Sequence, residues 1–169
     1  AYLRTLIAKP NSLHPPRLAG WTSYAIRTFP TAASPSRIPE AGDQVGTGRY
    51  LARIAGCASC HTPRTWLGFR DIAKLYAGGT LFEVPGVGRA IAKNLTPSLI
   101  GGLGGKSKQW FLAKFAGFRG PRGIQADSTR PRGWATVMPW VEYGGMSDEE
   151  IGAIYEYLKT RPPVDRATE

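Results

Sequence analysis

The residues with the most distinctive chemistry are two cysteines and a histidine in one short segment. Cys57 and Cys60 are the only cysteines in the chain, and His61 directly follows the second. This C-x-x-C-H spacing is the pattern used for covalent attachment of c-type haem. On one helical turn both thiols can reach the two vinyl groups of a haem, and the adjacent imidazole can reach the iron. The segment therefore predicts one covalent haem c with His61 as its proximal metal ligand.

Other interpretations of this segment remain open. A structural zinc site needs four Cys or His ligands, and only His14 lies outside the segment. A thioredoxin-like redox pair needs a preceding strand within a βαβ unit, and neither pattern is visible. An accidental match is the third alternative. Because the chain has only two cysteines, a disulfide framework is excluded.

A second axial ligand would decide what such a haem does, because methionine sulfur raises the reduction potential toward the range of electron carriers. The chain has two methionines. Met138 lies in a loop beside a stiffening proline and is the predicted metal ligand together with His61. Met146 directly precedes a predicted helix, where a hydrophobic staple explains it. His14 stands before two prolines and is interpreted as an ordinary surface residue.

The sequence around the C-x-x-C-H segment predicts a helix followed by a long loop. Apolar residues recur at helical spacing from Tyr50 to Ala55 and indicate a helix that leads to Cys57. Residues 62–105 are rich in Gly and Pro, with only a short helical candidate at Ile72–Ala77. Since a long loop in a compact domain needs a function, we expect it to wrap a cofactor.

Two further helices are predicted in the second half of the chain. Ser107 can cap a helix with an aromatic face. A loop from Pro121 to Trp140 separates it from a capping box formed by Ser147 and Glu150, which begins the last helix. Two prolines stop this helix soon after Lys159.

Composition and charge favour a loop-rich globular domain with a basic surface. Among 169 residues, 21 are Gly and 14 are Pro, and the formal net charge is +10. Such a surface favours encounter with an acidic partner, an anionic membrane surface or nucleic acid, without showing which, and a merely solvated basic surface is the other interpretation. The partners we expect are redox proteins with acidic docking surfaces. The bases are scattered through loops without a recognition motif, which argues against nucleic acid. No apolar run reaches the roughly 20 residues of a membrane span, and the start does not look like an intact signal peptide.

The same patterns divide the chain into three parts. Residues 1–45, with six prolines and scattered aromatics, predict an extended Pro-rich N-terminal arm or the remnant of a preceding domain. A short echo of residues 157–160 at residues 2–5 suggests the remnant. Residues 46–164 form the predicted haem domain, and residues 165–169 a C-terminal tail.

The order of these elements resembles the class I cytochrome c fold over about residues 46–164. More narrowly, the chain is similar to bacterial tandem-haem cytochromes c, including dehydrogenase-associated cytochrome subunits. Tandem-haem members carry two or three C-x-x-C-H motifs, whereas this chain has one. Five segments carry the narrower resemblance: Cys60-His61-Thr62-Pro63-Arg64, Tyr76-Ala77-Gly78-Gly79, Asn94-Leu95-Thr96-Pro97, Met138-Pro139-Trp140 and Gly152-Ala153-Ile154-Tyr155-Glu156-Tyr157-Leu158.

The resemblance implies a mainly α fold, with long loops that wrap one haem, in a location outside the bacterial cytoplasm. It also implies that Arg64, Asn94 and Trp110 lie near the haem, where their donors could hold propionates. In the family the first helix crosses the terminal helix, which would bring four residues together in the core: Tyr50, Ile54, Ile154 and Leu158.

The leading functional hypothesis is a monohaem cytochrome that transfers single electrons between redox partners. It would act either as a relay subunit of a larger membrane-associated respiratory or photosynthetic complex or as a shuttle. Iron with ligands on both sides has no open position for substrate, which argues against an enzyme. Two alternatives remain: a haem peroxidase or gas-binding domain, and a mainly structural subunit that clamps a redox complex.

Overall fold

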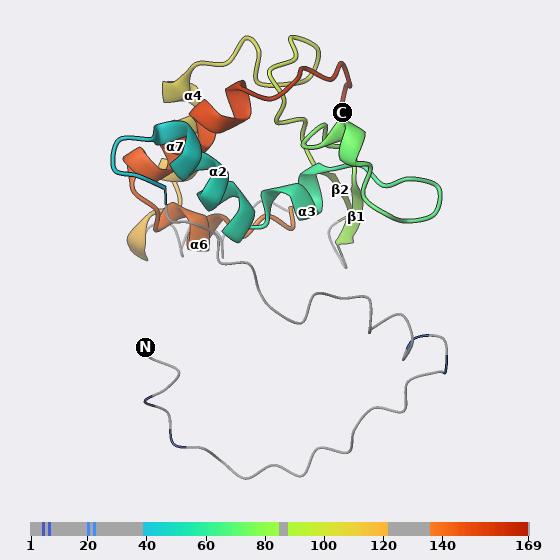
Figure 1. Ribbon diagram of the computed structural model, residues 1–169, viewed down its shortest axis with the longest axis horizontal. Coiled ribbons are helices and arrows are strands. Elements are labelled where there is room, and N and C mark those ends of the chain that lie inside the picture. Colours follow the sequence, from blue (N-terminus) through green and yellow to red (C-terminus); the bar gives the residue numbers. More distant parts are fainter. Residues whose placement is uncertain are drawn as a thin grey trace. The chain divides into compact units, whose positions relative to one another are not determined.

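The computed structural model describes residues 39–84, 88–121 and 136–168, together with Thr5, Ile7, Gly20 and Thr22. The chain divides into two units, Ala1–Arg37 and Ile38–Glu169, and every helix and strand named below lies in the second (Figure 1). The second unit is mostly helical with one small sheet, as the mainly α prediction requires. His14 and most of the predicted arm over residues 1–45 lie outside the described residues.

The C-x-x-C-H segment follows a capped helix and a sharp turn. Helix α2, Gln44–Ile54, begins at Asp43, whose carboxylate accepts a hydrogen bond from the Gly46 N–H at 2.7 Å. A separate short helix, α3, covers Cys57–His61. The two do not form the single helix expected up to Cys57, because Gly56 takes the left-handed conformation (φ +68°) and redirects the chain.

Helix α2 packs closely against the last helix, α7, Asp148–Lys159. The contact is made by the small residues Gly48 and Ala52, both buried, and a methyl group at Gly48 would overlap the Ala153 carbonyl. The predicted helix crossing is therefore confirmed. The expected role of Ile54 in it is wrong, since this side chain is 64% exposed. Close approach of the two backbones turns the small face of α2 toward α7 and leaves Ile54 outside.

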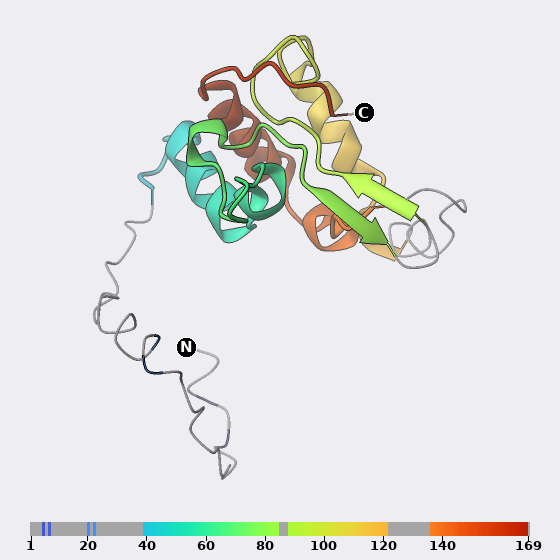
Figure 2. The same ribbon diagram turned by 90° about the vertical axis from the view of Figure 1, so that its right-hand side faces the viewer.

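The long segment after α3 contains more regular structure than the sequence predicted. The 3₁₀ helix η2, Ile72–Lys74, covers part of the predicted helical candidate. Strands β1, Leu81–Val84, and β2, Gly88–Ile91, pair antiparallel, with Leu81 opposite Ile91 (Figure 2). This sheet was not predicted, because four-residue strands with mostly exposed side chains leave no clear alternating pattern.

The later helices begin where their caps predict. Helix α4, Lys108–Ala116, starts at Ser107, whose hydroxyl accepts from the Trp110 N–H at 3.1 Å. The capping box of α7 is complete, with Ser147 and Glu150 exchanging hydrogen bonds of 2.8 and 3.1 Å. A short helix, α6, Trp140–Gly144, was not predicted. Five residues are too few to show a helical period.

The core lies between α2, α4 and α7, and side chains of α7 also bind the loop before α4. The Tyr155 hydroxyl donates to the Lys106 carbonyl at 2.7 Å, and Lys159 Nζ donates to the Gly104 carbonyl at 3.1 Å. No helix within the described part of the chain is long and apolar enough to cross a membrane. The buried core residues are Ala52, Tyr76, Leu103, Phe111, Phe115, Ile151, Ile154, Tyr155, Tyr157 and Leu158.

We predict that Gly48→Ala destabilises the domain by about 1–3 kcal/mol, since the added methyl overpacks the α2–α7 contact. Alanine in place of glycine within a helix normally stabilises by about 0.5–1 kcal/mol. Gly152→Ala in α7 is the matched control, because its methyl would meet only the flexible end of the Lys108 side chain. Urea unfolding of the haem-loaded variants measures both changes, and equal stabilities would contradict the prediction.

Candidate functional site

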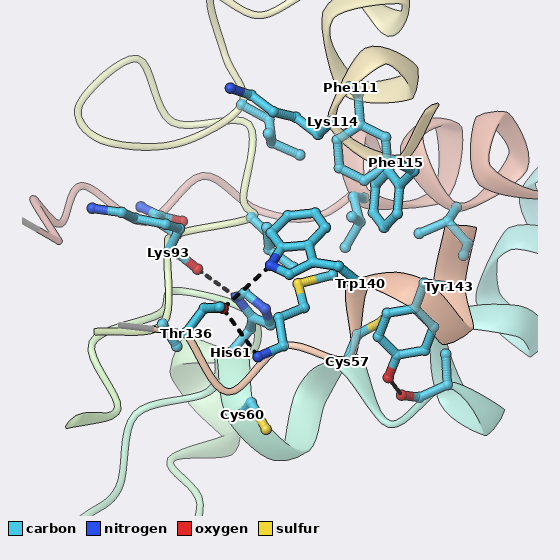
Figure 3. Close-up of a pocket in the computed structure, with 18 of the residues that line it drawn as sticks. Cys57, Cys60, His61, Lys93, Phe111, Lys114, Phe115, Thr136, Trp140 and Tyr143 are labelled. Carbon is cyan, nitrogen blue, oxygen red and sulfur yellow. Dashed lines mark hydrogen bonds between the residues drawn. The ribbon is translucent and has the colours of Figure 1, made fainter. Parts of the chain in front are cut away.

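A cavity of about 670 Å³ opens beside α3 and is lined mainly by apolar side chains. Its walls come from α3, β2 and the segment after it, α4, α6 and α7 (Figure 3). The four residues predicted to attach the haem or bind its iron all line this cavity: Cys57, Cys60, His61 and Met138. The tertiary structure thus brings together a segment in the first half of the chain and a loop almost 80 residues later.

The imidazole of His61 is oriented by a backbone carbonyl. Its Nδ1 lies 2.7 Å from the Lys93 carbonyl oxygen (Figure 3). Since a carbonyl only accepts, Nδ1 carries the proton and donates, which leaves the Nε2 lone pair available. Burial lowers the pKa of His61 below its usual value, opposed by the hydrogen bond to Lys93. A neutral, oriented imidazole is the form that binds a metal.

Two consecutive glycines allow the Lys93 carbonyl to reach His61. Gly78 has φ +69°, and a side chain there would lie 2.6 Å from backbone atoms of residues 92–94. Its N–H donates to the His61 carbonyl at 2.8 Å, and the Gly79 N–H donates to the Ala92 carbonyl at 2.7 Å. Only a residue without a Cβ permits this approach. The Gly78-Gly79 pair in the sequence is explained by this contact.

Both cysteine side chains are partly buried on the same wall of the cavity. Burial raises the pKa of the Cys57 thiol to about 11. Reactive cysteines of thioredoxin-like pairs have the opposite shift, because the thiolate is the nucleophile. This shift argues against the redox-thiol interpretation. Against the zinc interpretation, no group of three or more His, Cys, Asp or Glu side chains among the described residues could hold a metal ion.

The Met138 loop is fixed by a threonine hydroxyl that the sequence did not single out. Thr136 Oγ1 accepts from the Met138 N–H and from the Trp140 indole N–H, both at 3.2 Å (Figure 3). The Tyr143 hydroxyl donates to the Ala55 carbonyl at 2.5 Å and ties α6 to the end of α2. The only sequence signal for this role was a threonine two residues before the methionine. Threonine hydroxyls bond to nearby backbone in many turns, so this spacing is not specific.

Met146 also lines the cavity. It directly precedes the Ser147 cap of α7, and Ile151 stands at the fourth helical position, the spacing of a hydrophobic staple. Both residues belong to the core cluster or pack against it. Met146 therefore stands where the sequence predicts a staple for α7, and Met138 stands at the corresponding position before α6, next to its N-cap Pro139.

The three residues expected near propionates have different positions. Arg64 does not line the cavity; it is exposed, and its guanidinium donates to the Gly68 carbonyl at 2.8 Å. Trp110 lies at the cavity, 39% exposed, with the ammonium groups of Lys106 and Lys114 at 5.3 and 4.7 Å from its ring centre. These two lysines also line the cavity and were missed, because exposed lysines carry no sequence signal.

Asn94 lines the cavity, but its side chain is committed to other parts of the protein. Its Nδ2 donates to the carbonyls of Val164 (2.8 Å) and Arg166 (3.3 Å). Its Oδ1 accepts from the N–H and hydroxyl of Thr96 at 2.9 and 2.8 Å. With 2% of its surface exposed, Asn94 joins the loop that carries Lys93 to the C-terminal segment. These bonds indicate a positioning role for Asn94.

We predict that Asn94→Ala lowers the free energy of unfolding by about 1–3 kcal/mol, because buried carbonyl and N–H groups lose their partners. Asn94→Asp keeps the acceptor for Thr96 but turns a carboxylate oxygen toward the carbonyls of Val164 and Arg166, which only accept, so its cost should be at least as large. Thermal unfolding measures both, with Gln109→Ala on the exposed side of α4 as control. A stable Asn94→Ala variant with an altered reduction potential would instead indicate a direct contact with propionate.

Sequence comparison identifies relatives with a consistent description, although no family model matches. The chain is 33% identical over 149 residues, 88% of its length and 26% of the relative's, to the fructose dehydrogenase cytochrome subunit of Gluconobacter japonicus. It is 32% identical over 153 residues, 88% of its length and 44% of the relative's, to a diheme cytochrome c-type protein of Cereibacter sphaeroides. It is 30% identical over 114 residues, 66% of its length and 20% of the relative's, to the cytochrome c subunit of alcohol dehydrogenase (quinone) of Gluconobacter oxydans.

The chain spans less than half the length of each of these three relatives. All three are named as cytochromes, and two of them as subunits of dehydrogenases. The names of these relatives agree with the c-type haem motif that the sequence shows at Cys57, Cys60 and His61. The chain is a cytochrome c domain similar to the cytochrome subunits of dehydrogenases.

Proposed function

We propose that this chain carries one haem c, attached through Cys57 and Cys60 and ligated by His61 and Met138, and relays single electrons within a dehydrogenase-type complex. The observation that carries the proposal is the shared cavity, which gathers both thiols, an oriented imidazole and a thioether among apolar walls. One C-x-x-C-H segment in the sequence supports one haem. Bound haem supplies a one-electron couple at its iron.

The chain's own residues fit this cofactor in chemistry as well as in position. The cavity is large and apolar, as a macrocycle requires, and the two thiols lie at i and i+3 of the short helix α3. The neutral imidazole of His61 presents Nε2, while the Lys93 carbonyl fixes the ring. Apolar walls disfavour the additional positive charge of the oxidised site, which raises the reduction potential. We propose that Lys106, Lys114 and Trp110 lie where propionates would end.

The proposed position in a complex rests on the relatives and on charge. Two relatives are dehydrogenase subunits by name, and the chain has a formal net charge of +10. We infer a location outside the bacterial cytoplasm and redox partners with acidic surfaces, which such a charge attracts over several ångströms. A relay fixed in a complex accounts for these observations better than a free shuttle.

We predict that Met138→Ala abolishes the low-spin His/Met absorption spectrum and opens the iron to carbon monoxide. Removal of the thioether leaves the iron with one protein ligand. Met146→Ala is the matched control and should keep the spectrum, because Met146 serves as a staple for α7. Absorption spectroscopy of the ferrous proteins with and without carbon monoxide measures this. Loss of the spectrum in Met146→Ala alone would assign the ligand to Met146, and rapid carbon monoxide binding by the unaltered chain would favour the gas-binding alternative.

We predict that Thr136→Val weakens the charge-transfer absorption of methionine-ligated ferric haem, while Thr136→Ser retains it. Valine has nearly the same shape but leaves the Met138 and Trp140 N–H groups without their acceptor. The loss of this acceptor should destabilise the folded conformation of the methionine loop by about 1–3 kcal/mol. The measurement is the temperature at which the absorption band is lost. Equal temperatures for the valine and serine variants would show that the hydroxyl does not position Met138.

A further inference from the structure

The segment after α3 forms a defined hairpin that projects from the rest of the second unit (Figure 1). Arg64 and Arg70 pair as an antiparallel bridge at its base. The Thr65 N–H donates to the Phe69 carbonyl at 2.7 Å, and the Gly68 N–H donates to the Thr65 carbonyl at 2.9 Å. The Arg64 guanidinium adds a bond to the Gly68 carbonyl at 2.8 Å. The hairpin therefore has a hydrogen-bonded backbone, closed at its base by Arg64 and Arg70.

This hairpin presents large apolar side chains to solvent. Trp66 is 92% exposed, Phe69 71% and Leu67 58%, and Ile72 directly after the hairpin is 80% exposed. None of the four belongs to the core or lines the haem cavity. A cluster of exposed apolar side chains on an ordered loop marks an interaction surface, because neither packing nor the cofactor accounts for it.

A hollow of about 440 Å³ lies next to this cluster and is rich in arginine. Arg49 and Arg53 from α2 and Arg70 from the hairpin line it, together with the outer side of the turn at Gly56, Ala58 and Ser59. Within the described ranges, none of the three guanidinium groups forms an ion pair. Arg70 belongs to both features, so the apolar cluster and the cationic hollow form one continuous surface.

We propose that this surface binds an anionic phospholipid interface, with Trp66, Leu67 and Phe69 entering the interfacial region and the arginine hollow holding lipid phosphate. Tryptophan and phenylalanine at the tip of a narrow projection suit the boundary between headgroups and acyl chains. Arginine binds phosphate with two parallel hydrogen bonds. A phospholipid interface offers anionic phosphate and an apolar layer side by side, which matches both the arginines and the projecting apolar tip.

This binding would place α3 between the membrane surface and the cavity. Ala58 and Ser59 line the arginine hollow, while Cys57, Cys60 and His61 line the cavity on the other side. The proposal goes beyond electron transfer and stands independently of it, since the hairpin and the hollow contribute no residue that the proposed haem ligation uses.

Co-sedimentation of the haem-loaded full chain with vesicles tests the proposal. Binding should occur to vesicles of phosphatidylcholine mixed with phosphatidylglycerol and should be at least about tenfold weaker with phosphatidylcholine alone. The double variants Trp66→Ser/Phe69→Ser and Arg53→Gln/Arg70→Gln should each weaken binding to the mixed vesicles by at least about tenfold.

Two variants serve as matched controls. Ile100→Ser removes an exposed apolar side chain outside the hairpin, and Arg89→Gln removes an exposed charge from β2. Both should bind the mixed vesicles as the unaltered chain does. The haem absorption spectrum of every variant confirms that the domain is folded.

Three results would overturn the proposal. The first is equal binding to both kinds of vesicle, and the second is unchanged binding by either double variant. The third is an absence of vesicle binding together with loss of a dehydrogenase partner from the Trp66→Ser/Phe69→Ser variant, which would assign the surface to a protein interface. Electron transfer by the chain in solution would be unaffected by any of these results, so the proposed function is tested separately.

Discussion

The hydrogen bond between His61 Nδ1 and the Lys93 carbonyl is the contact on which the rest of the site depends. It joins residues 32 positions apart and fixes which imidazole nitrogen faces the cavity. The contact requires the backbone of residues 92–94 to lie close to the backbone at Gly78. Gly78 permits this because it has no side chain and takes φ +69°. Tyr76 just before it takes φ +67°, rare for a residue with a side chain. The local backbone is thus shaped to place one carbonyl beside one imidazole.

The loop that supplies this carbonyl is held mainly by the C-terminal part of the chain. Asn94 binds the carbonyls of Val164 and Arg166, and Lys159 reaches the carbonyls of Leu103 and Gly104. Helix α7 packs closely against α2 through Gly48 and provides one wall of the cavity with Ile151, Ile154 and Leu158. Helix α7 and the segment after it therefore anchor the helix before the C-x-x-C-H segment, the loop after that segment and one wall of the cavity.

The short helix α3 has different environments on its two sides. Toward the cavity it presents both cysteines and His61, and burial raises the pKa of Cys57 and lowers the pKa of His61. Away from the cavity it borders a hollow with three arginines. A low-polarity environment on one side and positive charge on the other both favour the reduced form of a site inside the cavity. The same geometry places the proposed electron-transfer centre directly behind the proposed docking surface.

The sequence by itself predicted the features whose chemistry is local. The C-x-x-C-H segment, the Ser107 cap and the Ser147–Glu150 capping box each depend on residues within a few positions, so their spacing is readable without a structure. Residues that act through distant partners were not predictable in this way. Asn94, which was expected near propionates, lines the cavity and also holds the C-terminal segment through carbonyls 70 and 72 positions away.

The tertiary structure alone decided the partners that come from distant parts of the chain. The close α2–α7 approach placed Gly48 and Ala52 in the contact and exposed Ile54, although helical spacing made Ile54 an equally good core residue. Thr136, Lys106 and Lys114 entered the site because two loops and helix α4 converge on the cavity. Hydrogen bonds and packing contacts between remote segments leave no periodic pattern in the sequence, because they depend on the path of the folded backbone. The sequence determined the chemistry of the site, and folding determined which side chains orient and surround it.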